Sequence, residues 1–175
     1  ALAVAWPLGV WGFSATAVAV AAAWAYSAEP LRMKRSWLWG PGLVGLCYEG
    51  LPWFTGAAVM LSALPRWEVL VIATLYAIGA HGIMTLNDFK SIAGDRAMGL
   101  RSLPAALGAD RAARLACVVM AVPQLVVIGL LLQWQQVPFA LGVLGVLLGQ
   151  IALMPRMLSD PERFAPWYNG TGIVL

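Results

Sequence analysis

Long apolar runs, separated by short polar or Pro/Gly-rich connections, dominate the pattern of hydrophobic and polar positions along the chain. Because a helix needs about 20 apolar residues to cross the hydrocarbon core of a bilayer, these runs predict membrane-spanning helices. The runs lack the alternation of polar and apolar residues that a lipid-facing β-barrel requires. We expect spans over residues 12–28, 41–62, 68–88, 111–132 and 137–157, with partial helices at 1–8 and from 167 onward.

The composition supports this interpretation. The chain is 61% hydrophobic and only 11% charged, with a mean hydropathy of +0.79, so it is predicted to be an integral membrane protein with an all-α, polytopic helix bundle. It begins without Met on ALAVAW and stops on GTGIVL, two stretches typical of interrupted apolar helices. We therefore expect residues 1–175 to form a single transmembrane domain and to be a fragment of a longer chain.

The basic residues are distributed unequally between two sets of connections. If the helices alternate in direction, the loops around 29–40, 88–110 and 156–166 share one side, and those around 63–67 and 133–136 share the other. Ten of the eleven lysines and arginines fall on the first side, which the positive-inside bias predicts to be cytoplasmic. The ten are Arg32, Lys34, Arg35, Lys90, Arg96, Arg101, Arg111, Arg114, Arg156 and Arg163.

The stretch TLNDFKSIAGDRAMGLRSLP places two carboxylates at the end of an apolar run. Asp88 and Asp95 are seven residues apart, which puts them on one face of a continuous helix. Gly94 and Gly99 suggest instead that the chain loosens after Asp88, so that Asp95 folds back over the helix end. Asn87 adds a further polar group at this depth, where such residues are costly and usually functional.

These oxygen ligands suit Mg²⁺, which proteins typically hold through one or two carboxylates together with substrate phosphates. Lys90, Arg96 and Arg101 provide the positive charge that a diphosphate needs. The chemistry favoured is the departure of diphosphate from an allylic carbon, because Mg²⁺ and cations stabilise the charge that develops on the leaving group. Two acids in a loop are equally typical of a solvated face, which is the alternative interpretation.

A second basic stretch, YSAEPLRMKR, covers residues 26–35. Pro30 ends the preceding helix and leaves Arg32, Lys34 and Arg35 outside it, on the same side as the aspartates. These charges either set the orientation of the helices or share an anion pocket with the aspartate loop.

Two polar residues lie inside predicted spans. His81 lies on the face of Asp88 and either binds a magnesium-bearing macrocycle or hydrogen-bonds a neighbouring helix. Glu49 is a carboxylate within a span, which is rare and tends to face a cavity, so it is a candidate sensor of a substrate head group. Gly142, Gly145 and Gly149 predict close helix packing. Tryptophans near helix ends indicate an interfacial belt.

NDFKSIAGDRAMGLRSLP resembles the second aspartate-rich motif of the UbiA-type intramembrane prenyltransferases, in the chlorophyll and bacteriochlorophyll synthase branch. YSAEPLRMKRS and WGPGLVGLCYEGLPWFTGAA are similar to segments of the same branch, and the similarity runs through essentially the whole chain. The resemblance implies a nine-helix bundle and, with Mg²⁺, esterification of the propionate of (bacterio)chlorophyllide by geranylgeranyl or phytyl diphosphate. It also implies a bacterial photosynthetic intracytoplasmic membrane.

The resemblance also implies the roles of individual residues. Asn87, Asp88 and Asp95 would hold the metal diphosphate, and the groups around the diphosphate would be Tyr26, Arg32, Lys34, Lys90 and Arg96. Family members carry another aspartate-rich motif on an earlier helix, which this sequence lacks, so the fragment alone is expected to be inactive.

Two other classes of function are compatible with the sequence. One is a pigment-binding or assembly subunit beside light-harvesting proteins, and the other is a transporter, although no inverted repeat supports the latter. No nucleic-acid-binding module is present.

Overall fold

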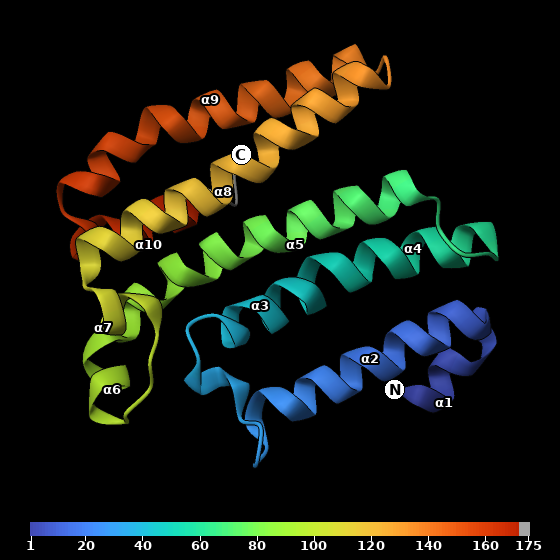
Figure 1. The fold of residues 1–175 in the computed structure, drawn as a ribbon, viewed down its shortest axis with the longest axis horizontal. Helices are drawn as coiled ribbons and strands as arrows, with labels where there is room; N and C mark the ends of the chain where they lie inside the picture. Colours follow the sequence, from blue (N-terminus) through green and yellow to red (C-terminus); the bar gives the residue numbers. More distant parts are fainter. Residues whose placement is uncertain (172–175) are drawn as a thin grey trace.

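The computed structural model describes residues 1–171, which form helices joined by short connections (Figure 1). Within this part of the chain there is no strand, only an isolated bridge between Ser36 and Arg101, so the predicted all-α class is confirmed. The helices are α1 (Leu2–Ala5), α2 (Gly9–Ser27), α3 (Trp39–Gly45), α4 (Leu51–Leu61), α5 (Trp67–Asn87), α6 (Ile92–Ala97), α7 (Leu103–Leu107), α8 (Ala109–Gln133), α9 (Val137–Ser159) and α10 (Pro161–Thr171).

Four segments of the described chain are long and apolar enough to cross a membrane, namely Leu2–Ser27, Trp67–Ala97, Ala109–Gln133 and Val137–Ser159. The predicted span at 41–62 is interrupted, because a π-helical turn, η3 (Leu46–Gly50), separates α3 from α4. Pro52 lies just beyond that turn, and because proline has no backbone N–H it cannot donate a hydrogen bond to the carbonyl four residues earlier. A π-turn relieves this conflict and also re-aims the side chains within it, including that of Glu49.

The ends of two helices differ from the predicted ranges. The helix expected from residue 12 begins at Gly9, whose φ of +75° interrupts the helical backbone between η1 (Trp6–Leu8) and α2. α10 begins at Pro161 rather than at 167, since a proline fits the first turn of a helix. The carboxylate of Asp160 accepts the Arg163 backbone N–H at 3.3 Å and caps this turn. Residues 172–175 of the helix predicted from 167 onward lie outside the described residues.

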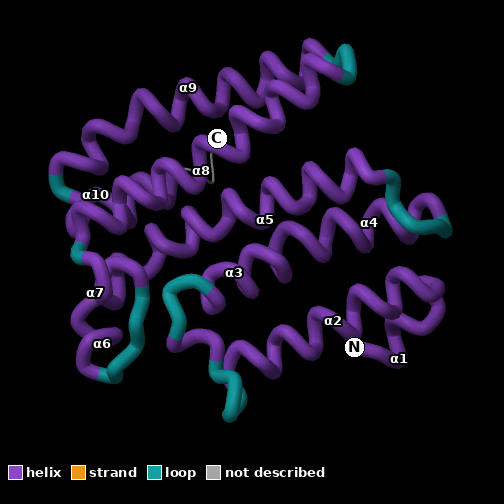
Figure 2. Tube along the Cα trace, viewed as in Figure 1, coloured by secondary structure: helices purple, strands orange, loops and turns teal. Residues whose placement is uncertain are grey.

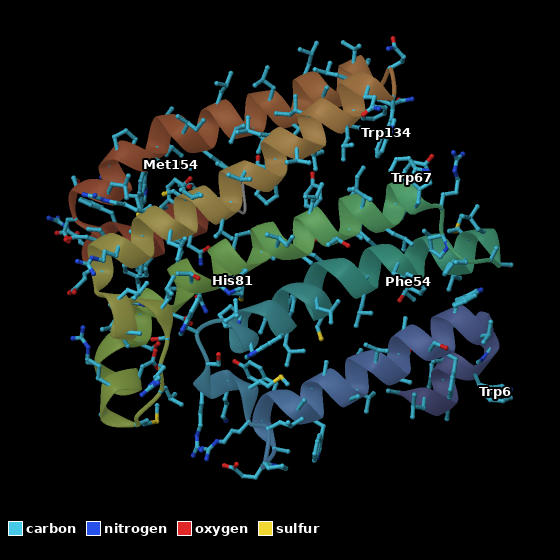
Figure 3. The ribbon with its side chains drawn as sticks, viewed as in Figure 1. Trp6, Phe54, Trp67, His81, Trp134 and Met154 are labelled. Atoms are coloured by element: carbon cyan, nitrogen blue, oxygen red, sulfur yellow. The ribbon has the colours of Figure 1, made fainter. Side chains whose placement is uncertain are left out.

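The connections gather at the two ends of the bundle (Figure 2). At one end lie the loop after α2, the α6–α7 region and the turn between α9 and α10; at the other lie residues 62–66 and 134–136. The two sets of loops therefore lie at opposite ends, as the alternation of helices predicts. The rings of Trp67 and Trp134 meet edge to face at the second end, with centroids 5.5 Å apart (Figure 3).

α5 is the central helix of this arrangement and contacts α3 on one side and α8 on the other. Glycines allow both approaches: Gly45 of α3 lies against the carbonyl of Ala77, and a Cβ at Gly82 would lie 2.8 Å from the carbonyl oxygen of Ala116. The prediction of close packing was wrong for Gly142 and Gly145, since a Cβ at either position would meet no atom within 4 Å.

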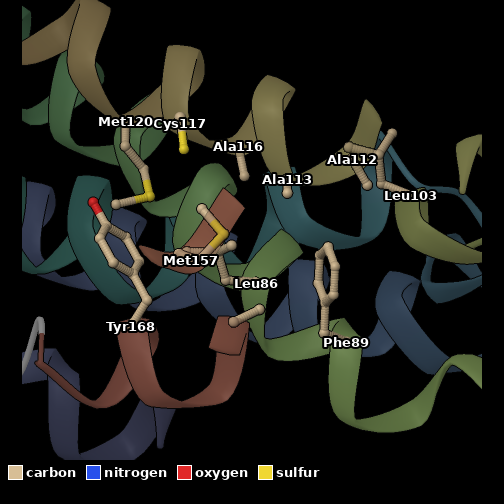
Figure 4. Packing of buried hydrophobic residues seen from close by; sticks show 11 residues of the cluster. Leu86, Phe89, Leu103, Ala112, Ala113, Ala116, Cys117, Met120, Met157 and Tyr168 are labelled. Atoms are coloured by element: carbon tan, nitrogen blue, oxygen red, sulfur yellow. The ribbon is translucent and has the colours of Figure 1, made fainter. Parts of the chain in front are cut away.

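The main hydrophobic cluster lies at the end of the bundle that carries the basic loops (Figure 4). Leu86 is fully buried and Phe89 is 5% exposed, and both pack into this cluster against α8, α9 and α10. The burial of Leu86 and Phe89 fixes the rotation of the chain at the end of α5. Asn87 and Asp88, which lie between them in the sequence, therefore point away from the cluster and line a cavity. The cluster consists of Leu86, Phe89, Leu103, Ala112, Ala113, Ala116, Cys117, Met120, Met157, Ala165 and Tyr168.

Candidate functional site

A cavity of about 270 Å³ lies at this end of the bundle, between the end of α2, the start of α3 and the α5–α6 segment. We call it the acid cavity, because Asp88 and Asp95 both line it. The lining combines oxygen donors, a lysine and aromatic rings from segments that are far apart in the sequence. The lining residues are Tyr26, Lys34, Ser36, Trp37, Gly40, Pro41, Val44, Met84, Asn87, Asp88, Ser91, Asp95, Leu100 and Ser102.

Asp88 and Asp95 reach the same cavity because the chain between them stays helical. α5 continues through a 3₁₀ segment, η4 (Asp88–Ser91), into α6, and Gly94 lies inside α6. The expectation that the chain loosens at Gly94 was therefore wrong; it turns only at Gly99, where φ is +66°. A single glycine lowers helix propensity by about 1 kcal/mol, which the burial of Phe89, five residues earlier in the same segment, can offset.

Ser91 connects the two acidic positions. Its hydroxyl oxygen lies 3.1 Å from the backbone carbonyl oxygen of Asp88 and 3.1 Å from Oδ2 of Asp95. Asp95 is only 7% exposed, whereas Asp88 is half-buried. Within residues 1–171 neither carboxyl group forms an ion pair shorter than 4.0 Å, so both line the cavity without a protein cation against them.

Tyr26 and Lys34 line the cavity from other segments. Tyr26 lies in the last turn of α2, and Lys34 lies in the 3₁₀ segment η2 (Met33–Arg35). The backbone N–H of Arg101 donates to the carbonyl of Arg35 at 3.3 Å, and this bond holds η2 beside the segment that follows α6. The cavity thus presents a lysine and a tyrosine hydroxyl together with two carboxylates, which is a suitable lining for an anion that carries a divalent cation.

The other predicted basic residues lie outside the acid cavity. Lys90 is exposed, and its ammonium donates to Oδ1 of Asn87 at 3.2 Å. Arg96 is exposed in the last turn of α6. Arg32 and Arg101 line a neighbouring recess, which shares only Ser36 and Trp37 with the acid cavity.

A larger groove of about 600 Å³ begins on the adjacent turns of α5. Ala80 and Ile83 line this groove, whereas Met84 and Asn87 line the acid cavity, so the two spaces follow one another along the helix. Most of the groove is apolar, and it runs between α4, α5, α8 and α9. Its lining residues are Glu49, Trp53, Ile72, Leu75, Tyr76, Gly79, Ala80, Ile83, Met120, Pro123, Gln124, Val127, Leu131, Pro138, Phe139, Gly142, Val143, Val146 and Gln150.

Polar groups are placed at a few points of this groove. Glu49 faces it from the π-turn, as expected for a carboxylate inside a span. The rings of Trp53 and Tyr76 stack with centroids 5.6 Å apart and an interplanar angle of 26°. Gln124 and Gln150 both line the groove and contact each other directly, since Nε2 of Gln124 donates to Oε1 of Gln150 at 2.7 Å. Sequence reasoning missed these two amides, although each is a polar residue within an apolar run.

His81 lines neither the acid cavity nor the groove. It lies on α5 near α3 (Figure 3), and its Nε2 atom is buried without a hydrogen-bond partner among the described residues. Both interpretations of this residue, a ligand to a pigment metal or a contact between helices, would use that nitrogen.

The donor set of the acid cavity fits a magnesium ion that arrives with a phosphate ligand. Carboxylate oxygens of Asp88 and Asp95 and the amide oxygen of Asn87 are hard donors. The described residues contain no group of three or more His, Cys, Asp or Glu side chains that could hold a metal ion. Two carboxylates alone leave most of the octahedral positions of Mg²⁺ to water and phosphate oxygens.

The fold is that of a polytopic membrane protein, and a cavity lined by two carboxylates, a tyrosine and a lysine lies at one end of its helices. The chain belongs to the UbiA prenyltransferase family, whose profile matches residues 1–168. The resemblance seen in its motifs is thereby confirmed.

Proteins similar to this chain carry more specific names. The chain is 58% identical to the bacteriochlorophyll synthase 33 kDa chain of Cereibacter sphaeroides, and the match covers 99% of the chain and 58% of that protein. It is 56% identical to the protein of the same name from Rhodobacter capsulatus, with the same coverage of both chains. Identity to the bacteriochlorophyll synthase 34 kDa chain of Chloroflexus aurantiacus is 45%, over 86% of the chain and 48% of the relative.

The chain thus spans a little over half the length of the first two relatives. No solved structure matches it.

Proposed function

We propose that the protein is a Mg²⁺-dependent bacteriochlorophyll or chlorophyll synthase. It would join the propionate carboxylate of (bacterio)chlorophyllide to a geranylgeranyl or phytyl group and release diphosphate. The observation that carries this proposal is the acid cavity, where Asp88 and Asp95 face Tyr26 and Lys34 in a chain 58% identical to a protein named bacteriochlorophyll synthase.

The proposed reaction is a displacement at an allylic carbon. A carboxylate oxygen of the pigment forms the new C–O bond, and the bond between C1 of the prenyl group and the diphosphate oxygen breaks. The electron pair of that bond leaves with the diphosphate. A bound Mg²⁺ would neutralise charge on the leaving group. The pigment itself supplies the nucleophile, so no activated serine or cysteine is needed.

We assign metal binding and diphosphate binding to different residues of the acid cavity. Asp88 and Asp95, with Asn87, would hold the metal, while Lys34 and Tyr26 would contact the diphosphate oxygens and stabilise the charge that develops there. Lys90 and Arg96 are exposed nearby, and we assign them to the capture of the incoming anion. Arg32 and Arg101 line the neighbouring recess, and we leave them outside the diphosphate site.

The apolar groove suits the hydrophobic part of the substrates. A prenyl chain whose diphosphate lies in the acid cavity could continue along the face of α5 that carries Ala80 and Ile83. Burial of each methylene group contributes about 0.8 kcal/mol, so the groove would supply much of the binding energy. Glu49 remains a proposed pigment contact because it faces the groove. His81 lines neither space, so its buried Nε2, unpartnered within residues 1–171, fits a contact between helices better.

The proposed location is a bacterial photosynthetic intracytoplasmic membrane, with the loops that carry the motifs on the cytoplasmic side. The excess of basic residues at that end of the bundle supports this orientation. A soluble prenyl diphosphate head group and a membrane-bound tail would then both reach the cavity from one leaflet.

The experiment uses the full-length protein in liposomes with bacteriochlorophyllide, geranylgeranyl diphosphate and Mg²⁺, and measures esterified pigment by chromatography. Asp88→Asn should lower the rate by about 100-fold or more, as loss of a charge-stabilising group does. Asp110→Asn is the matched control, since Asp110 is exposed at the start of α8 and lies outside the cavity. It should leave the rate unchanged.

Two outcomes would contradict the proposal. If the wild type forms no ester but retains the pigment, the protein is a pigment-binding or assembly subunit instead. If Asp88→Asn is as active as the wild type, the acid cavity is not the site of the reaction.

A further inference from the structure

A second recess, of about 430 Å³, opens beside the acid cavity and has a different lining. Three guanidinium groups line it, those of Arg32, Arg35 and Arg101, together with the indoles of Trp37 and Trp39. We call it the arginine recess. No carboxylate lines it, whereas two line the acid cavity.

Two segments that are distant in the sequence build the arginine recess. Arg32 has a left-handed backbone conformation, with φ of 37°, which turns the chain into η2. As a result Arg32 lines the arginine recess, whereas Lys34 lines the acid cavity. The Arg101 backbone N–H donates to the Arg35 carbonyl at 3.3 Å, and Ser36 pairs with Arg101 in an isolated parallel bridge. These bonds bring Arg101 to the two arginines of the earlier loop.

The recess carries more positive charge than its neighbours neutralise. Oε1 of Glu29 lies 3.1 Å from Nη1 of Arg32 and 3.6 Å from Nη1 of Arg35. Within residues 1–171 Arg101 has no carboxylate partner closer than 4.0 Å. Three guanidinium groups against one carboxylate leave a net charge of about +2, which favours the binding of an anion.

The rim of the recess is apolar and exposed. Trp37 is 39% exposed, Trp39 is 61% exposed and Leu31 is 51% exposed. They lie between the end of α2 and the start of α3, at the end of the bundle where the basic loops gather. Indole rings favour the level of lipid headgroups, so the rim places the recess at the membrane surface with acyl chains beside it.

We propose that the arginine recess binds the phosphate of an anionic phospholipid headgroup. The guanidinium groups would hold the phosphate oxygens, and Trp37, Trp39 and Leu31 would contact the glycerol backbone and the upper part of the acyl chains. A diphosphate substrate held by a metal needs carboxylates, which line the acid cavity and not this recess. Ser36 and Trp37 form the wall between the two sites, so the bound lipid would also order the segment that presents Lys34.

The test measures lipid binding without any substrate. The full-length protein in a neutral detergent is titrated with phosphatidylglycerol, and the bound lipid is counted by native mass spectrometry. The test variant is Arg35→Gln/Arg101→Gln. The control is Arg111→Gln/Arg114→Gln, which removes the same charge from exposed positions on α8 outside the recess. A parallel titration with inorganic phosphate and one with phosphatidylcholine separate the headgroup phosphate from a free anion and from a zwitterionic lipid.

Each basic residue near anionic lipid contributes a factor of about five in affinity, so the recess variant should bind phosphatidylglycerol on the order of 25-fold more weakly. The control variant should bind phosphatidylglycerol as tightly as the wild type does, which excludes a general effect of charge. Phosphatidylcholine and inorganic phosphate should both bind more weakly than phosphatidylglycerol, which excludes a site for a zwitterionic lipid or a free anion. Equal losses in the two variants would overturn the proposal in favour of diffuse surface charge. Undiminished binding in the recess variant, or inorganic phosphate bound as tightly as the lipid, would overturn it as well.

Discussion

The spacing between α5 and α8 depends on Gly82, and replacing this glycine tests the packing that supports the acid cavity. In Gly82→Ala the new Cβ would lie 2.5 Å from Cγ of Met120 and 2.8 Å from the carbonyl oxygen of Ala116. The methionine side chain can move, but the carbonyl belongs to the backbone of α8. That helix must retreat by about 0.6 Å before the contact reaches the 3.4 Å of ordinary van der Waals separation.

Overpacking of this kind costs about 1–3 kcal/mol. The better helix propensity of alanine returns up to about 1 kcal/mol, and Gly79→Ala measures this second effect alone. Gly79 lies on the same helix, and a Cβ there would meet no atom within 4 Å. We therefore expect Gly82→Ala to be less stable than Gly79→Ala by about 1–3 kcal/mol.

The assay is unfolding of the full-length protein in mixed micelles by titration with a denaturing detergent. Tryptophan fluorescence reports the fraction folded, and the two variants are compared at the same micelle composition. Equal stability of the two variants would refute the close approach of α5 and α8 at Gly82.

Three further changes test the site and the groove. Lys34→Gln should raise the KM for the prenyl diphosphate at least about tenfold, because it removes a charge-assisted contact worth about 1.5–3 kcal/mol; an unchanged KM would exclude Lys34 from the diphosphate site. Ser91→Ala should lower kcat/KM about fivefold by removing the hydroxyl at 3.1 Å from Asp95, and Ser91→Thr should restore it; a failure of threonine to do so would argue against this role. Gln150→Leu should destabilise the fold by about 0.5–1.5 kcal/mol in the same unfolding assay, since Nε2 of Gln124 then keeps only the Met120 carbonyl oxygen as an acceptor, and adding Gln124→Leu to this variant should cost less than Gln124→Leu alone, which independent side chains would not show.

The membrane-spanning helices could largely be predicted because their apolar runs are long and uninterrupted. The exception is the run at 41–62, where the structure has a π-turn at Leu46–Gly50. Pro52 in the middle of that run was an available signal for a break. The pattern of apolar residues alone does not encode it, because the apolar positions around the turn are still compatible with a buried or lipid-facing helix.

The candidate site could be predicted in its acidic half and only partly in its basic half. Asp88 and Asp95 come from one helical segment, so their spacing places them on one face. Lys34 and Arg32 are two residues apart, yet they line different spaces, because the left-handed conformation of Arg32 redirects the chain between them. Such a local turn, and the bond from Arg101 that holds it, depend on tertiary contacts that sequence spacing does not reveal.

The most direct test of the account is whether the acid cavity binds a divalent cation together with a diphosphate. Mn²⁺ can replace Mg²⁺ as a paramagnetic probe, and electron paramagnetic resonance then measures the free ion in the presence of the full-length protein and geranylgeranyl diphosphate. We expect the wild type and Asp110→Asn to take up Mn²⁺ when the diphosphate is added, whereas Asp88→Asn/Asp95→Asn should not. Undiminished uptake by that double variant would contradict it.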